Sequence, residues 1–105
     1  MTAIQDSTLR QIYSLARLYQ TGYRSATVDT AIHKLVSMGR EQLLREKQEL
    51  EAQLKSFEMR YGLSSEEFHR RFEAGEMGDD ADMFEWDAFY RMWSSVEKQL
   101  NALES

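Results

Sequence analysis

The sequence predicts an all-α protein: a helical hairpin-type bundle with one long central helix, which we expect dimerisation to complete. No Pro occurs among the 105 residues and only five are Gly, so helices joined by short loops are favoured. Residues 25–61 hold a single interior Gly and read as one helix. Such a helix would extend for about 55 Å, which is longer than a compact chain of this size is wide. We therefore expect it to contact a partner.

The first predicted helix begins near Ser7, with Asp6 or Ser7 as its N-cap, and ends before Gly22, which can take the left-handed conformation that stops a helix. Its apolar face repeats at helical spacing. That face comprises Leu9, Ile12, Tyr13, Ala16 and Tyr19. Ser25 is suited to cap the long helix. We expect that helix to continue through Gly39, because strong helix formers follow it at once.

Gly62 is predicted to end the long helix, and the next helix carries the clearest local signal in the chain. Ser64 as N-cap and Glu67 three residues later form a capping box, and this short helix is expected to end before Gly75. A last helix is predicted from Asp82, which could cap it together with Glu85. Spacings of three and four give that helix an apolar stripe. The stripe comprises Trp86, Phe89, Trp93, Val96, Leu100 and Leu103.

Charge is distributed unevenly along what we expect to be a single helical domain, residues 1–105. The net charge is −5, yet residues 1–40 hold five basic and two acidic residues, whereas residues 61–105 hold four basic and eleven acidic ones. We divide the domain into a two-helix dimerising part (8–38), a continuation of the long helix (39–61) and an acidic, aromatic-rich partner-binding half (62–105). A basic start and an acidic end favour two different partners.

The turn Gly22-Tyr23-Arg24-Ser25, followed by apolar residues at helical spacing, resembles the two-helix part of ribbon-helix-helix proteins. The resemblance covers about residues 8–38 and implies that a second chain completes the core. In that family the preceding strand enters the DNA major groove. Met1 to Asp6 departs from the pattern, because it is short and has no basic residue. We therefore expect dimerisation, with Arg10, Arg17 and Arg24 as candidate phosphate contacts.

A second resemblance belongs to the C-terminal half. The string from Phe57 through the Ser64-Ser65-Glu66-Glu67 start, then Phe72 to Asp80 and Glu85-Trp86, is similar to small prokaryotic proteins that look like antitoxins of toxin–antitoxin pairs. The resemblance implies a protein partner of the toxin class. It supplies no catalytic residues.

Large apolar and acidic side chains in the C-terminal half are the candidate partner contacts. Several Met and aromatic residues lie off the apolar stripe, and a surplus of such residues is typical of binding surfaces. Residues of the stripe itself, such as Trp86 and Trp93, are most simply interpreted as part of a core. The predicted partner-binding residues are Met77, Asp79, Asp80, Asp82, Met83, Phe84, Trp86, Tyr90, Met92 and Trp93.

We predict no catalytic, cofactor or metal site. His33 and His69 stand alone in the sequence, without a Ser or carboxylate spaced for a triad. Asp80 and Asp82 resemble the first two positions of a calcium loop, but Phe84 and Glu85 replace the residues required next. The absence of Cys excludes thiolate chemistry.

The sequence also favours a cytoplasmic protein. The N-terminus lacks the basic start and apolar stretch of a signal peptide, and no apolar run approaches 20 residues. Three functions remain open. The leading hypothesis is an antitoxin-like protein that neutralises a basic, RNase-type toxin, and the alternatives are a DNA-binding autorepressor of ribbon-helix-helix type and a structural helical oligomer with neither activity.

Overall fold

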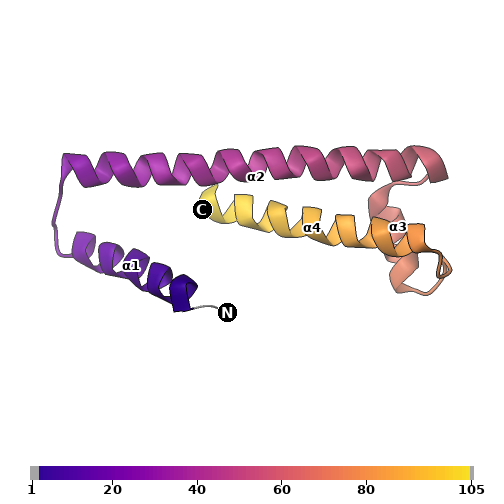
Figure 1. Cartoon of the computed structure of the whole chain (residues 1–105), viewed down its shortest axis with the longest axis horizontal. Coiled ribbons are helices and arrows are strands. Elements are labelled where there is room, and N and C mark those ends of the chain that lie inside the picture. The colour runs from indigo at the N-terminus through magenta and orange to yellow at the C-terminus, as the bar shows by residue number, and fades with distance from the viewer. Residues whose placement is uncertain (1–2, 105) are drawn as a thin grey trace. The chain divides into compact units, whose positions relative to one another are not determined.

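The computed structural model describes the backbone of residues 3–104 and the side chains of residues 7–104. Four helices follow one another in this range, as Figure 1 shows: α1 (Ala3–Gln20), α2 (Ala26–Tyr61), α3 (Ser65–Glu73) and α4 (Ala81–Glu104). No strand occurs among these residues. The all-helical fold class is confirmed, and so is the presence of one long helix, α2, with 36 residues.

Helix α1 begins at Ala3, four residues earlier than the sequence predicted. Neither Gly nor Pro interrupts the chain before Ser7, so nothing prevents an extra helical turn ahead of the expected cap. Its end agrees with the prediction. The amides of Thr21 and Gly22 bond to the carbonyls of Leu18 and Tyr19, each at 3.1 Å, and Gly22 has a φ of 96°.

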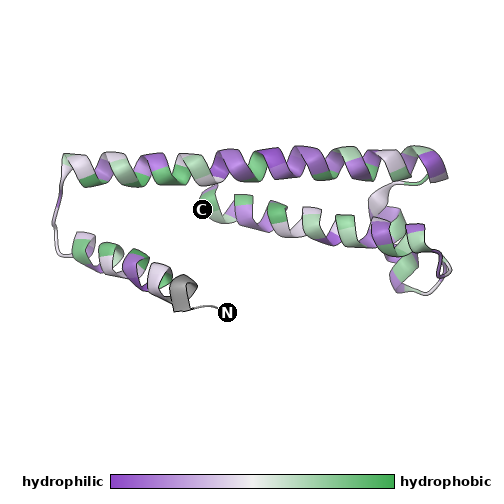
Figure 2. Cartoon of the chain, in the orientation of Figure 1, coloured by the Kyte–Doolittle hydropathy of each residue, from purple (hydrophilic) through white to green (hydrophobic). Residues whose placement is uncertain are grey.

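Helix α2 continues through Gly39, as expected, to Tyr61. Ser25 caps its start, because the Ser25 hydroxyl accepts a hydrogen bond from the amide of Val28 at 3.2 Å. Gly62, with a φ of 65°, follows its last residue. In Figure 2, hydrophobic and hydrophilic residues alternate along each helix, as in amphipathic helices.

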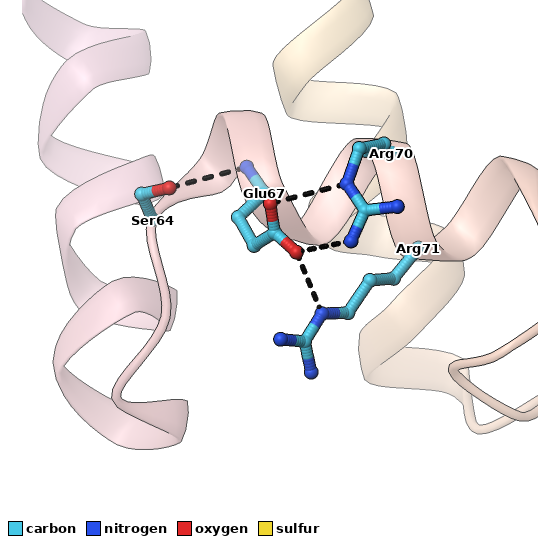
Figure 3. Close-up of polar contacts among 4 residues, drawn as sticks. All are labelled: Ser64, Glu67, Arg70 and Arg71. Carbon is cyan, nitrogen blue, oxygen red and sulfur yellow. Dashed lines mark hydrogen bonds and ion pairs between the residues drawn. The ribbon is translucent and has the colours of Figure 1, made fainter.

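Helix α3 is capped twice at its N-terminus. The Ser64 hydroxyl accepts from the amide of Glu67 at 3.1 Å, which confirms Ser64 as the N-cap. The carboxylate of Glu67 does not complete the expected capping box with Ser64, because it accepts hydrogen bonds from Arg70 and Arg71 (Figure 3). Glu58, in the last turn of α2, instead accepts from the amide of Ser65 at 2.8 Å. An acidic side chain therefore still faces this helix terminus.

Contacts divide the chain into two compact units, Met1–Leu35 and Val36–Ser105, called here the N-terminal unit and the C-terminal unit. In the C-terminal unit α4 runs antiparallel to α2, because Lys47 pairs with Glu97 and Arg60 pairs with Asp82. The core lies here, between α2, α3 and α4. It consists of Leu54, Phe57, Phe68, Met83 and Trp86, and Val96 and Leu100 are also buried farther along α4.

Candidate partner-binding surfaces

Two of the predicted partner-binding residues, Met83 and Trp86, lie in the core. Trp86 is 0% exposed and stacks on Phe68, with ring centroids 3.9 Å apart. Its indole nitrogen donates to the buried Ser65 hydroxyl at 2.9 Å. Met83 was expected to lie off the apolar stripe, but it precedes Trp86 by three residues and therefore faces the same side of α4. Neither side chain is accessible to a partner in this structure.

Asp82 is engaged within the C-terminal unit. It was predicted to cap α4, but α4 begins one residue earlier, at Ala81, so Asp82 lies in the first turn. Its Oδ2 accepts from the Tyr61 hydroxyl at 2.6 Å and from Arg60 at 2.8 Å. These two hydrogen bonds, Tyr61 first, lower the pKa of the Asp82 carboxyl. The contact ties the start of α4 to the end of α2.

The loop before α4 and the first turn of α4 present apolar and acidic groups together. Phe84 is 57% exposed and touches the ring of Phe72 edge-on, with centroids 5.4 Å apart. Met77 is half-buried and packs against the core. Asp79 and Asp80 are exposed, and neither forms an ion pair with another described residue. This is the part of the predicted surface that the structure leaves available.

Tyr90 and Trp93 line a different face, an open cavity of about 420 Å³ between α2, α4 and the start of α3. The Trp93 indole donates to the Glu51 carboxylate at 3.0 Å. Tyr90 stacks on Trp93, with centroids 5.8 Å apart. Three Glu residues line the cavity with Lys55 as the single basic group, so the site carries negative charge.

Met92 lies on yet another face. It is exposed and lines an open groove of about 510 Å³ on the opposite side of the α2–α4 pair. Phe84, Ala88 and Met92 are spaced by four residues and are all exposed, so they form a stripe along α4, called here the outer stripe. The ten predicted residues are thus distributed over the core, the loop and different faces of α4 rather than one surface.

His69 is part of a network that the sequence did not reveal. Its Nδ1 lies 2.8 Å from Oδ1 of the buried Asp87, and its Nε2 lies 3.4 Å from Glu73. The other Asp87 oxygen pairs with Arg91 at 2.7 Å. The description of His69 as standing alone was therefore wrong, because a pairing across 18 residues depends on how α3 packs on α4. Both ring nitrogens are engaged by carboxylates, so this network fastens two helices together.

The candidate phosphate contacts differ in how far they are engaged. Arg24 donates to the carbonyl of Tyr23 at 2.7 Å, and its guanidinium lies 4.9 Å from the centre of the Tyr19 ring. Arg17 bonds to Ser14 at 3.3 Å, whereas Arg10 is exposed. Residues 3–6 are helical, where the resemblance implied a strand, and Met1 and Thr2 lie outside the described residues. The DNA contact of a ribbon-helix-helix protein is thus not reproduced in the described part of the chain.

The N-terminal unit exposes its apolar residues. None of its described side chains is buried, and its least exposed apolar residues, such as Ile32, are only half-buried. Tyr19 joins α1 to α2 by donating its hydroxyl hydrogen bond to Asp29 at 2.6 Å, which raises the pKa of Tyr19 to about 12. The large exposed apolar residues of this unit are Leu9, Ile12, Tyr13, Leu15, Leu18, Tyr23 and Leu35.

The described residues bring together no group of three or more His, Asp or Glu side chains suited to a metal ion. None of the described helices is both long enough and apolar enough to cross a membrane. No protein-family model, curated protein or solved structure matches the chain.

Proposed function

We propose that the chain is a non-enzymatic, antitoxin-like interaction protein that binds and neutralises a basic toxin of the RNase type. The observation that carries the proposal is the exposed apolar side chain of Phe84 beside acidic groups that lack ion-pair partners among the described residues. Apolar anchors supply most of the affinity of a protein interface, while charge accelerates the encounter. The similarity of the C-terminal half to antitoxins adds support.

The proposed contact surface comprises the outer stripe together with Asp79, Asp80 and Glu85. Phe84 and Met92 lie two helical turns apart and would anchor a partner along α4, with Ala88 between them allowing close approach. The three carboxylates are exposed at the start of α4 and would meet basic groups of the toxin. A toxin of the RNase type needs a basic surface to bind RNA, and that positive charge is the one these carboxylates would meet.

The test uses the purified protein encoded next to this chain in its genome. We expect a complex at low salt, a block of RNA cleavage by that protein, and affinity at least about tenfold weaker for Phe84→Ala. Met59→Ala is the matched control, because Met59 is more exposed than Phe84 but lies on α2, away from the outer stripe. If the protein encoded by the adjacent gene is soluble but forms no complex with this chain at low salt, the proposal is wrong.

The other functions remain predictions, because no described feature favours them. A DNA-binding autorepressor would shift its own promoter in a mobility assay, and replacing Arg10, Arg17 and Arg24 by Ala would abolish the shift. A structural oligomer would self-associate and bind neither toxin nor DNA. The cytoplasmic location also stays a prediction, as does completion of the helical bundle by a second chain.

A further inference from the structure

The groove of about 510 Å³ on the C-terminal unit has an apolar floor and one acidic rim. Its floor consists of Leu50, Phe89, Val96 and the side chain of Met92, contributed by α2 and α4. Glu46 and Glu49 form the α2 rim, while the α4 rim carries only neutral polar groups. A helix with one apolar face fits such a groove, provided that one of its flanks is basic.

The two rim carboxylates are exposed on α2. Neither Glu46 nor Glu49 forms an ion pair with another described residue, although Lys47 between them pairs with Glu97. Two acids without an ion-pair partner beside an apolar floor favour a cationic partner. The groove therefore selects the charge of the helix that occupies it as well as its shape.

Helix α1 has the complementary pattern. Leu9, Ile12 and Tyr13 share one face and are each half exposed or more. Arg10 and Arg17, seven residues apart, project within about 20° of each other on one flank of that face. The opposite flank carries Gln11 and no charge. One basic flank and one neutral flank match the one acidic rim and the one neutral rim of the groove.

We propose that α1 of a second copy of this chain occupies the groove, and that the two copies exchange α1 helices reciprocally in a closed homodimer. Each copy carries both a basic amphipathic helix without a groove and an acidic groove without a helix. A twofold pairing satisfies both at once and leaves no open end for further copies. Of the surface proposed for the toxin, Met92 lines the groove and would be covered in the dimer, whereas Phe84, Asp79, Asp80 and Glu85 do not line it. The exchange therefore leaves those four residues free and does not depend on the toxin-binding function.

Cross-linking between differently tagged full-length copies tests the contact, because the natural chain contains no Cys. We expect Ile12→Cys in one copy and Met92→Cys in the other to form a mixed disulfide, since the two side chains would meet in the groove. Ser14→Cys, on the far side of α1, is the matched control and should give roughly tenfold less. Equal yields, or a disulfide that forms only within a chain carrying both Cys, would overturn the proposal.

Charge reversal tests the same contact in solution. By sedimentation, we expect Glu46→Arg with Glu49→Arg, or Arg10→Glu with Arg17→Glu, to weaken the dimer by about tenfold or more. Combining all four changes in one chain should restore it, whereas Glu41→Arg, off the rim, should leave it unchanged. The exchange would be refuted if the chain stays monomeric up to about 100 µM, or if these charge reversals leave the dimer dissociation constant unchanged. Toxin binding is measured separately with Phe84→Ala, so either proposal can fail alone.

Discussion

The two units contain similar helices but differ in what those helices bury. In the C-terminal unit α2, α3 and α4 share one core, which Phe68 of α3 closes by stacking on Trp86. In the N-terminal unit two helices meet at a turn without a third element, and none of the described side chains is buried. Helix formation is local, whereas burial needs a further layer. The exchange proposed above would supply the layer that the N-terminal unit lacks.

The largest effect we expect separates the two units directly. Phe68→Ala removes a fully buried ring from the stack on Trp86 and should lower the free energy of unfolding by about 3–5 kcal/mol. Ile12→Ala, 57% exposed, should change it by less than about 0.5 kcal/mol when the chain is monomeric. Urea denaturation followed by circular dichroism measures both. Similar losses for the two variants would remove the distinction between the units.

A second variant tests the polar network of the C-terminal unit. Asp87→Ala leaves His69 and Arg91 without their buried partner, and we expect a loss of about 1.5–3 kcal/mol in the free energy of unfolding. Asp79→Ala is the control, since Asp79 is exposed in the loop before α4. If the two variants are equally stable in urea, the network does not hold α3 against α4.

A stabilising change is expected where α2 passes from one unit toward the other. Gly39 is helical, and a Cβ placed there would meet no atom within 4 Å. Gly39→Ala should therefore raise stability by about 0.5–1 kcal/mol, because it lowers the entropy of the unfolded chain without strain. Thermal unfolding measures the gain. A lower melting temperature would show that α2 needs Gly at this position.

The smallest expected effects lie at opposite ends of the pH scale. Hydrogen bonds from Arg70 and then Arg71 lower the pKa of Glu67 from 4.5 to about 2, so their stabilisation is present above pH 4.5 and is lost as pH falls toward 2. The hydrogen bond to Asp29 raises the pKa of Tyr19 from 10.0 to about 12, so its contribution is present below pH 10 and is lost as pH rises toward 12.

Residue-resolved NMR titration follows each of these groups. Acid should weaken the contacts of Glu67 in the C-terminal unit, and alkali should weaken the contact of Tyr19 in the N-terminal unit. Glu67→Gln and Tyr19→Phe are the matched variants, and each should remove the dependence in its own range. Titration of either group at its ordinary pKa would show that the contact does not persist in solution.

The signals that predicted the fold are those encoded within a few residues. Ser64 preceding an acidic first turn identified the start of α3, and Gly22 and Gly62 marked the ends of α1 and α2. Each acts through the backbone of its own turn, so its effect can be inferred without a tertiary structure. The start of α1 was wrong because several residues there are able to begin a helix.

The candidate site was less predictable because it depends on distant pairings. Asp82 meets Tyr61, and Asp87 meets His69, across 21 and 18 residues, and no spacing rule encodes such contacts. Met83 was a different kind of error. Its position three residues before Trp86 already placed it on the buried face, so the signal was present in the sequence.

Hydrogen exchange measured residue by residue, at protein concentrations below and above the dimer dissociation constant, tests the central claim most directly. We predict that core amides around Phe57 and Trp86 are protected at both concentrations, because the C-terminal unit closes its own core. Amides of α1 should gain protection only at the higher concentration, when a second copy covers Leu9 and Ile12. Protection of α1 that equals that of the core in the monomer would contradict the account.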